Sequence, residues 1–82
     1  MKLKTEYKKY KTDPQKISFL LNVLKRDTLG SEISKIDNKT YSIGSRWDKV
    51  EFPKRLFDVL KPHLRKVVER DELNNYIYWE LK

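Results

Sequence analysis

The chain has 82 residues, a formal net charge of +7 and no cysteine, and only 38% of its residues are hydrophobic. This length fits one domain spanning residues 1–82 with a small core, and the lack of cysteine excludes disulfides and thiolate chemistry. Because no run approaches the roughly 20 apolar residues of a membrane span and no signal peptide opens the chain, we expect a cytoplasmic protein without a membrane partner.

The opening stretch MKLKTEYKKYKT alternates lysine or glutamate with Leu, Thr and Tyr from residue 2 to residue 8. A period of two is typical of a half-buried strand, and Thr and Tyr favour strands. We therefore predict a strand over residues 2–8, with its lysines on the solvent side. The alternation fails at Lys9, so residues 9–11 are expected to fray into an arm.

The next stretch, TDPQKISFLLNVLKRDTLG, predicts a helix over residues 14–27. Pro14 suits a first helical turn, and Gly30 suits a stop signal. Apolar side chains recur at helical spacing in Ile17, Leu20 and Leu24. This apolar stripe is interpreted as part of the core.

A hairpin follows in SEISKIDNKTYSIGSRW, where Asn38-Lys39 can form a tight turn. Its second strand would place Tyr41, Ile43, Ser45 and Trp47 on one face, because alternate residues of a strand point the same way.

A second helix is predicted from Pro53, and Pro62 should kink or end it because proline lacks an N–H donor. Residues 64–73 fit two interpretations, a continued helix or a strand over 64–70 followed by a loop. The final strand, residues 76–81, is clearer because Ile, Trp and Leu alternate with tyrosines.

These elements follow the order β-α-β-β-α-β, the split βαβ arrangement of ferredoxin-like domains. The predicted fold class is α+β, with two helices on one face of a small, mostly antiparallel sheet. The other face would be open to solvent unless a second copy covers it. The low apolar fraction and this uncovered face together predict a homodimer.

Enzyme function is the weakest interpretation of this sequence. His63 is the one histidine, which makes a zinc site improbable, and general acid–base catalysis needs a positioned partner that no motif supplies. Gly30 and Gly44 are the only glycines, so no glycine-rich phosphate-binding loop exists. We therefore expect no catalytic residue, no metal and no cofactor.

The charge distribution favours nucleic acid as the partner, with RNA ahead of DNA. Residues 1–16 carry six lysines against Glu6 and Asp13, and residues 46–70 form a second basic block. Basic clusters interleaved with aromatic rings are typical of proteins that hold single strands by stacking and phosphate contacts. The side chains predicted to contact nucleic acid are Lys2, Lys4, Tyr7, Lys8, Lys9, Tyr10, Lys11, Arg46, Lys54, Arg55, Arg65 and Lys66.

Two other functions remain open, a protein-interaction module and a nuclease that uses His63 with a nearby lysine or tyrosine. A four-stranded sheet that displays aromatic rings resembles the RNA-recognition motif, but TYSIGSRW lacks that family's basic and glycine-aromatic run, so membership is not supported. The main alternative function is a protein-interaction module, such as a phage-type inhibitor or antitoxin that blocks a host enzyme or a defence toxin. In that case the aromatic residues would lie at a protein interface, where Tyr, Trp and Arg are common hot spots.

Overall fold

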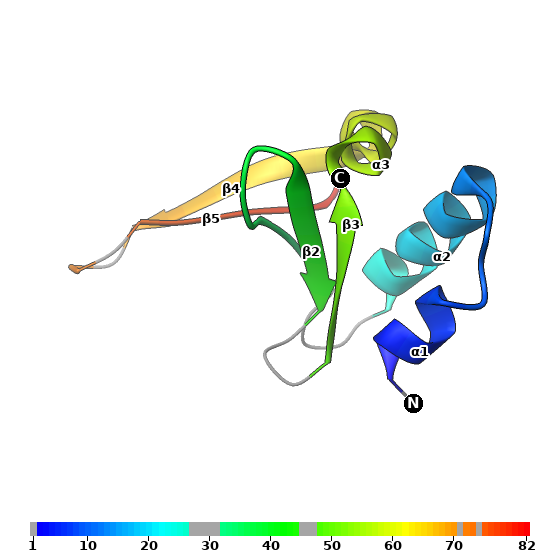
Figure 1. The fold of residues 1–82 in the computed structure, drawn as a ribbon. Helices are drawn as coiled ribbons and strands as arrows, with labels where there is room; N and C mark the ends of the chain where they lie inside the picture. Colours follow the sequence, from blue (N-terminus) through cyan, green and yellow to red (C-terminus); the bar gives the residue numbers. More distant parts are fainter. Residues whose placement is uncertain (1, 27–31, 45–47, 71, 74) are drawn as a thin grey trace.

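The computed structural model describes residues 2–26, 32–44, 48–70, 72–73 and 75–82. Within these residues the chain is α+β, with three α-helices and a five-stranded antiparallel sheet (Figure 1). In chain order the elements are α1 (Leu3–Tyr7), α2 (Asp13–Lys25), β1 (Ile33–Lys35), β2 (Thr40–Gly44), β3 (Lys49–Pro53), α3 (Lys54–Leu60), a 3₁₀ turn (Lys61–His63), β4 (Leu64–Arg70) and β5 (Asn75–Leu81).

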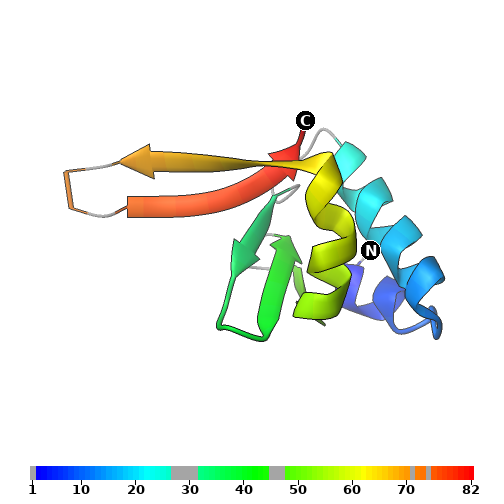
Figure 2. The same ribbon diagram turned by 90° about the horizontal axis from the view of Figure 1, so that it is seen from above.

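The strands lie in the order β3-β2-β1-β5-β4, so β3 and β4 form the two edges of the sheet. β1 meets β5 through a single register pair, Ile33 with Trp79, whereas β4 and β5 pair along their whole length. The β4–β5 hairpin consequently projects from the body of the molecule as a two-stranded ribbon (Figures 1 and 2).

The core lies between the helices and one face of the sheet, which we call the helix face. Register pairs Tyr41 with Phe52 and Ile43 with Val50, and all four side chains are buried there. The opposite face, which we call the open face, carries Ser34 and Ser42 in this part of the sheet. The buried apolar side chains are Leu3, Phe19, Leu20, Val23, Leu24, Ile33, Tyr41, Ile43, Val50, Phe52, Leu56, Phe57, Leu60 and Leu64.

The predicted strand over residues 2–8 is wrong, because Leu3–Tyr7 form the helix α1. Leu3 and Tyr7 are two residues of a period-two pattern, but they are also four apart and therefore lie on one face of a helix. Leu3 is buried in the core, and its N–H donates a hydrogen bond of 2.8 Å to Oδ1 of Asp48. A stretch of five residues fits both the strand period and the helical period, and the packing of Leu3 in the core favours the helix.

The predicted ferredoxin-like order is also wrong, because the described elements follow the order α-α-β-β-β-α-β-β. The strand β3 was not predicted, although KVEFP alternates exposed and buried residues. It pairs with β2 from Thr40 to Gly44 and forms one edge of the sheet.

The other predicted elements are largely confirmed. The helix predicted over 14–27 spans Asp13–Lys25, and the hairpin turns between β1 and β2 at residues 36–39. Pro53 caps α3, which ends before Pro62 as expected. Residues 64–70 take the strand alternative. The strand positions predicted for Ser45 and Trp47 lie outside the described residues.

Among the described residues, no helix combines the length and apolarity that crossing a membrane would require.

Candidate nucleic-acid interface

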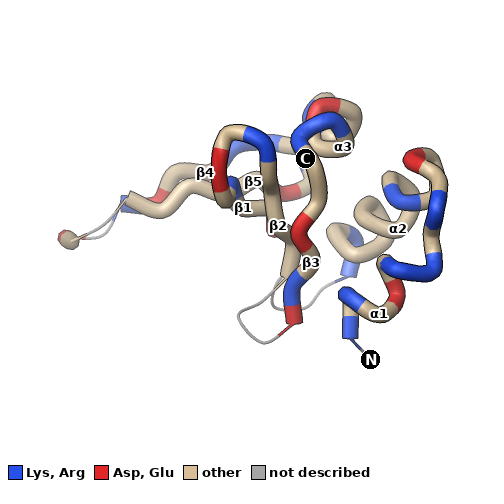
Figure 3. The backbone as a smooth tube through the Cα atoms, viewed as in Figure 1, with Lys and Arg blue, Asp and Glu red and all other residues tan. Residues whose placement is uncertain are grey.

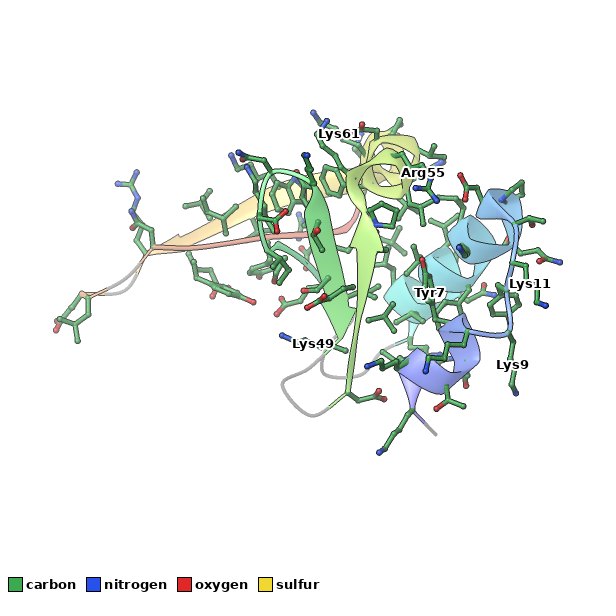
Figure 4. All side chains as sticks on the ribbon, in the orientation of Figure 1. Tyr7, Lys9, Lys11, Lys49, Arg55 and Lys61 are labelled. Atoms are coloured by element: carbon green, nitrogen blue, oxygen red, sulfur yellow. The ribbon has the colours of Figure 1, made fainter. Side chains whose placement is uncertain are left out.

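The N-terminal lysines lie on and after α1, at the end of the molecule away from the β4–β5 hairpin (Figures 3 and 4). Lys2, Lys4, Lys8, Lys9 and Lys11 are all exposed, and none forms an ion pair with another described residue. They therefore form a positive surface at this end of the molecule.

Tyr7 and Tyr10 were predicted as stacking platforms, but both are half-buried beside this surface. Their ring centroids lie 6.1 and 5.4 Å from that of Phe19 on α2. Lys16 Nζ lies 5.5 Å from the centre of the Tyr7 ring. Burial is the main cause of the raised pKa of the Tyr7 hydroxyl. These contacts hold α1 against α2, so each ring has limited area left for a base.

Three cations of the second basic block, Lys54, Arg55 and Arg65, are already paired with carboxylates. Arg55 binds Asp13 through two hydrogen bonds of 3.1 and 3.3 Å, which lower the pKa of the Asp13 carboxyl and raise that of the guanidinium. Lys54 lies 3.2 Å from Asp58 one turn along α3.

Arg65 likewise forms an ion pair with Glu80 across the β4–β5 hairpin. Arg46 lies outside the described residues. Lys66, like Lys49, Lys61 and Arg70 of the same block, is exposed and has no ion-pair partner among the residues that the structure describes.

Lys66 belongs to a groove on the helix face, where the hairpin leaves the body of the protein. The groove encloses about 410 Å³. We call it the hairpin groove and define it by its lining residues, Lys35, Tyr41, Lys66, Asn75, Ile77 and Trp79.

The sheet register explains why these side chains converge. Lys66 on β4 is paired with Trp79 on β5, and Trp79 is paired with Ile33 on β1. Two residues along β1, Lys35 is paired with Tyr41 on β2. Since alternate residues of a strand share a face, four neighbouring strands contribute to one continuous patch.

Aromatic packing supports one end of the groove. The Tyr41 ring stacks on Phe57 of α3, with centroids 3.8 Å apart and planes 5° apart. Trp79 meets both rings edge-on, at 5.7 Å from Tyr41 and 5.1 Å from Phe57. Tyr41 and Phe57 are buried, whereas Trp79 is only half-buried. Trp79 therefore has a fixed inner edge and an accessible outer part in the groove.

The two faces of the hairpin differ in charge. The hairpin groove contains Lys35 and Lys66 and no acidic side chain. On the open face, Tyr76 donates a hydrogen bond of 3.0 Å to Glu32, and Tyr78 donates one of 3.0 Å to Glu69. The hydrogen bond to Glu69 is the main cause of the raised pKa of Tyr78. The helix face of the hairpin is therefore positive, and the open face, with Glu32, Glu69 and Glu80 against Arg65, is negative.

Among the residues that line this groove, Lys66 alone was predicted from the sequence to contact nucleic acid. A usable signal existed in the two alternating stretches LRKVVER and YIYWEL, since pairing them as a hairpin puts a lysine opposite a tryptophan.

Three other features were considered as candidate sites, and none combines charged side chains with an aromatic ring as the hairpin groove does. A second hollow of about 280 Å³ lies between the α1–α2 connection and α2, and no charged residue lines it. His63 is exposed in the 3₁₀ turn. In the described part of the chain, no three His, Asp or Glu side chains are grouped so that they could hold a metal ion.

Comparison of this chain with protein-family models, with curated proteins and with solved structures gives no match.

Proposed function

We propose that this protein binds single-stranded nucleic acid, RNA in preference to DNA, through the hairpin groove and without catalysis. The observation that carries the proposal is the meeting of a half-buried tryptophan, part of which lines the groove, with two lysines that lack ion-pair partners among the described residues. Stacking surfaces beside unpaired cations are the two components from which single-strand sites are built.

Each side chain has a separate role in this proposal. Trp79 stacks on a base, an interaction worth about 1–3 kcal/mol per base in other proteins. Lys35 and Lys66 bind the phosphates on either side of that base. Asn75 offers an amide that can donate to, and accept from, a base edge. The groove accepts an unpaired base, because stacking on Trp79 requires a free base face.

The N-terminal lysines have a secondary role as a source of long-range attraction. They are exposed and lie at the end of the molecule away from the β4–β5 hairpin (Figure 3). Exposed charges more than about 10 Å apart are largely screened at 0.1 M salt. These lysines therefore raise the rate of encounter at low salt and contribute little to the bound geometry.

The test compares two double variants that remove the same amount of charge. Lys35→Gln with Lys66→Gln removes both cations of the groove, whereas Lys25→Gln with Lys49→Gln removes two exposed lysines that do not line it, one on α2 and one on β3. Affinity for labelled single-stranded RNA and DNA is measured by fluorescence anisotropy at several salt concentrations. Two lost phosphate contacts should make the log–log salt slope shallower by about 1.4 in the groove variant.

The control variant should keep the slope of the wild type. Equal weakening by both variants with no change of slope would show diffuse attraction and contradict the groove. If wild-type protein binds neither RNA nor DNA at low salt, the proposed function is wrong.

A second function is favoured by a different observation, the apolar side chains exposed on the hairpin. Leu73 is 88% exposed in the β4–β5 connection, and Val68 and Ile77 are about half exposed. Apolar side chains that project into solvent are typical of protein-binding surfaces. The alternative is therefore a module that inserts this hairpin into a host protein and inhibits it. Leu73→Ser should abolish such binding while leaving nucleic-acid affinity unchanged.

A further inference from the structure

The strand β4 is an edge of the sheet, and its outer side is open in the part of the chain that the structure describes. Its one partner strand there is β5, and no strand or helix covers the outer side of the ribbon in Figure 2. An open edge seven residues long exposes a row of unpaired N–H and C=O groups that can pair with another strand.

The hydrogen bonding of the hairpin shows which residues face that edge. The N–H of Lys82 donates to the carbonyl of His63 over 3.1 Å, so residues 63 and 82 form a hydrogen-bonded pair. Hydrogen-bonded and non-hydrogen-bonded pairs alternate along an antiparallel ladder. Residues 65, 67 and 69 therefore bond to β5, and the backbone groups of residues 64, 66, 68 and 70 point outward.

We propose that two copies of this chain dimerise by antiparallel pairing of β4 with β4, around a two-fold axis at Val67. In this register Arg65 lies opposite the partner's Glu69, and Glu69 lies opposite the partner's Arg65. Lys66 lies opposite the partner's Val68, and Leu64 lies opposite the partner's Arg70. The two sheets join into one ten-stranded sheet.

Charge complementarity selects this register over its neighbours. In the dimer, residues whose backbone groups point outward must pair with residues of the same kind in the partner. The two-fold axis must therefore pass through a residue of β4, and the neighbouring registers have it at Lys66 or at Val68. An axis at Lys66 places that lysine opposite its own copy. An axis at Val68 places Lys66 opposite the partner's Arg70. Like charges directly opposite each other destabilise a strand pair, and opposite charges stabilise it. Only the axis at Val67 pairs opposite charges without a like-charge pair.

The interface extends interactions already present on the open face. Arg65 forms an ion pair with Glu80, and Glu69 accepts a hydrogen bond from Tyr78. In the dimer, Arg65 lies between Glu80 and the partner's Glu69. The axis is perpendicular to the sheet, so both hairpin grooves face the same side. This inference does not depend on nucleic-acid binding, because it rests on the strand edge and its charges alone.

The test uses two charge-reversal variants, alone and mixed. Glu69→Arg alone would place Arg65 opposite a second arginine, and Arg65→Glu alone would place Glu69 opposite a second glutamate. Each should weaken dimerisation by roughly tenfold or more. Mixing the two variants restores an opposite-charge pair at both positions, so a heterodimer should form. Mass is measured by light scattering and by native mass spectrometry, and circular dichroism checks that each variant is folded.

A proline variant tests the backbone pairing without altering charge. Val68→Pro removes an N–H that points to the open edge, so the β4–β5 ladder keeps its hydrogen bonds and the dimer is lost. Wild-type protein should show twice the 10.0 kDa mass of the chain at tens of micromolar. A wild-type monomer at hundreds of micromolar overturns the proposal. Dimers that survive Val68→Pro, or single charge variants that dimerise like the wild type, overturn this interface.

Discussion

The ring of Tyr41 lies flat on that of Phe57, with 3.8 Å between centroids. This stack joins β2 to α3, and Trp79 meets both rings edge-on from β5. Three elements that are distant in sequence are thereby fixed at the base of the hairpin. The same contacts orient the part of Trp79 that lines the groove, so core packing and the proposed binding site share residues.

The first prediction concerns this aromatic contact. Phe57→Ala should lower the free energy of unfolding by about 3–5 kcal/mol, because it removes a fully buried ring and leaves a cavity. Val59→Ala on the same helix is the control, since Val59 is 57% exposed. Its effect should stay within about 0.5 kcal/mol. Urea denaturation followed by circular dichroism measures both. Similar small losses for the two variants would contradict the packing of α3 described above.

The second prediction concerns Gly44 at the end of β2. Its φ of +119° lies in a region that side chains rarely adopt, and a Cβ there would collide with the carbonyl oxygen of Asp48. Gly44→Ala should therefore destabilise the protein by more than about 1 kcal/mol. Ser18→Ala, at an exposed position of α2, is the control. A thermal midpoint for Gly44→Ala equal to that of the control would show that the chain relaxes at this turn.

The third prediction concerns pH. The hydrogen bonds from Arg55 hold the pKa of Asp13 below its ordinary value, so the folded protein binds a proton at this carboxyl less readily than the unfolded chain. The resulting stabilisation is present above the unfolded pKa of about 3.9 and is lost as pH falls through the lower folded pKa. Wild type should therefore melt above Asp13→Asn at neutral pH.

That difference in thermal midpoint should shrink as pH falls below about 4. It should be modest throughout, because both side chains are at least half exposed and exposed ion pairs contribute little. A difference that is the same at neutral and strongly acidic pH would mean that Asp13 acts through the start of α2 rather than through its charge on Arg55.

Local signals predicted some elements well. In α2, the helical spacing of apolar residues agrees with the cap, since Thr12 Oγ1 accepts a hydrogen bond from the N–H of Gln15. Pro53 and Pro62 correctly predicted where α3 begins and ends. The cap of α2 and the prolines that flank α3 act on residues close in sequence, and each pattern fits only one type of secondary structure. The same local pattern was ambiguous in α1, where Leu3 and Tyr7 satisfied both a strand and a helix.

The site depends on contacts that no local pattern contains. Arg55 and Asp13 are 42 residues apart in the sequence, so their pairing could not be inferred from a basic cluster. Lys66 meets Trp79 only after β4 and β5 adopt one particular register. A one-residue slip would move the lysine to the other face. The basic composition therefore predicted nucleic acid as the partner. Proposing the hairpin groove as its binding site required the arrangement of the strands.

The fourth prediction separates the N-terminal lysines from the groove. Changing Lys4, Lys8, Lys9 and Lys11 together to glutamine should lower affinity for single-stranded RNA at low salt. If all four contacted phosphates, the salt slope would become shallower by about 3 units. Because they lie away from the groove, we expect a change below about 1 unit. Anisotropy titrations across several salt concentrations measure it, and a change near 3 units would move the binding site to α1.

Titrating isotope-labelled protein with a short single-stranded RNA, and following its resonances by NMR, tests the hairpin groove most directly. The amides of Lys35, Lys66 and Ile77 and the indole N–H of Trp79 should shift progressively and saturate together. Shifts in residues 2–11 should be smaller and should fade as salt is raised. Saturable shifts confined to residues 2–11, with an unchanged Trp79 indole, would contradict binding in the groove.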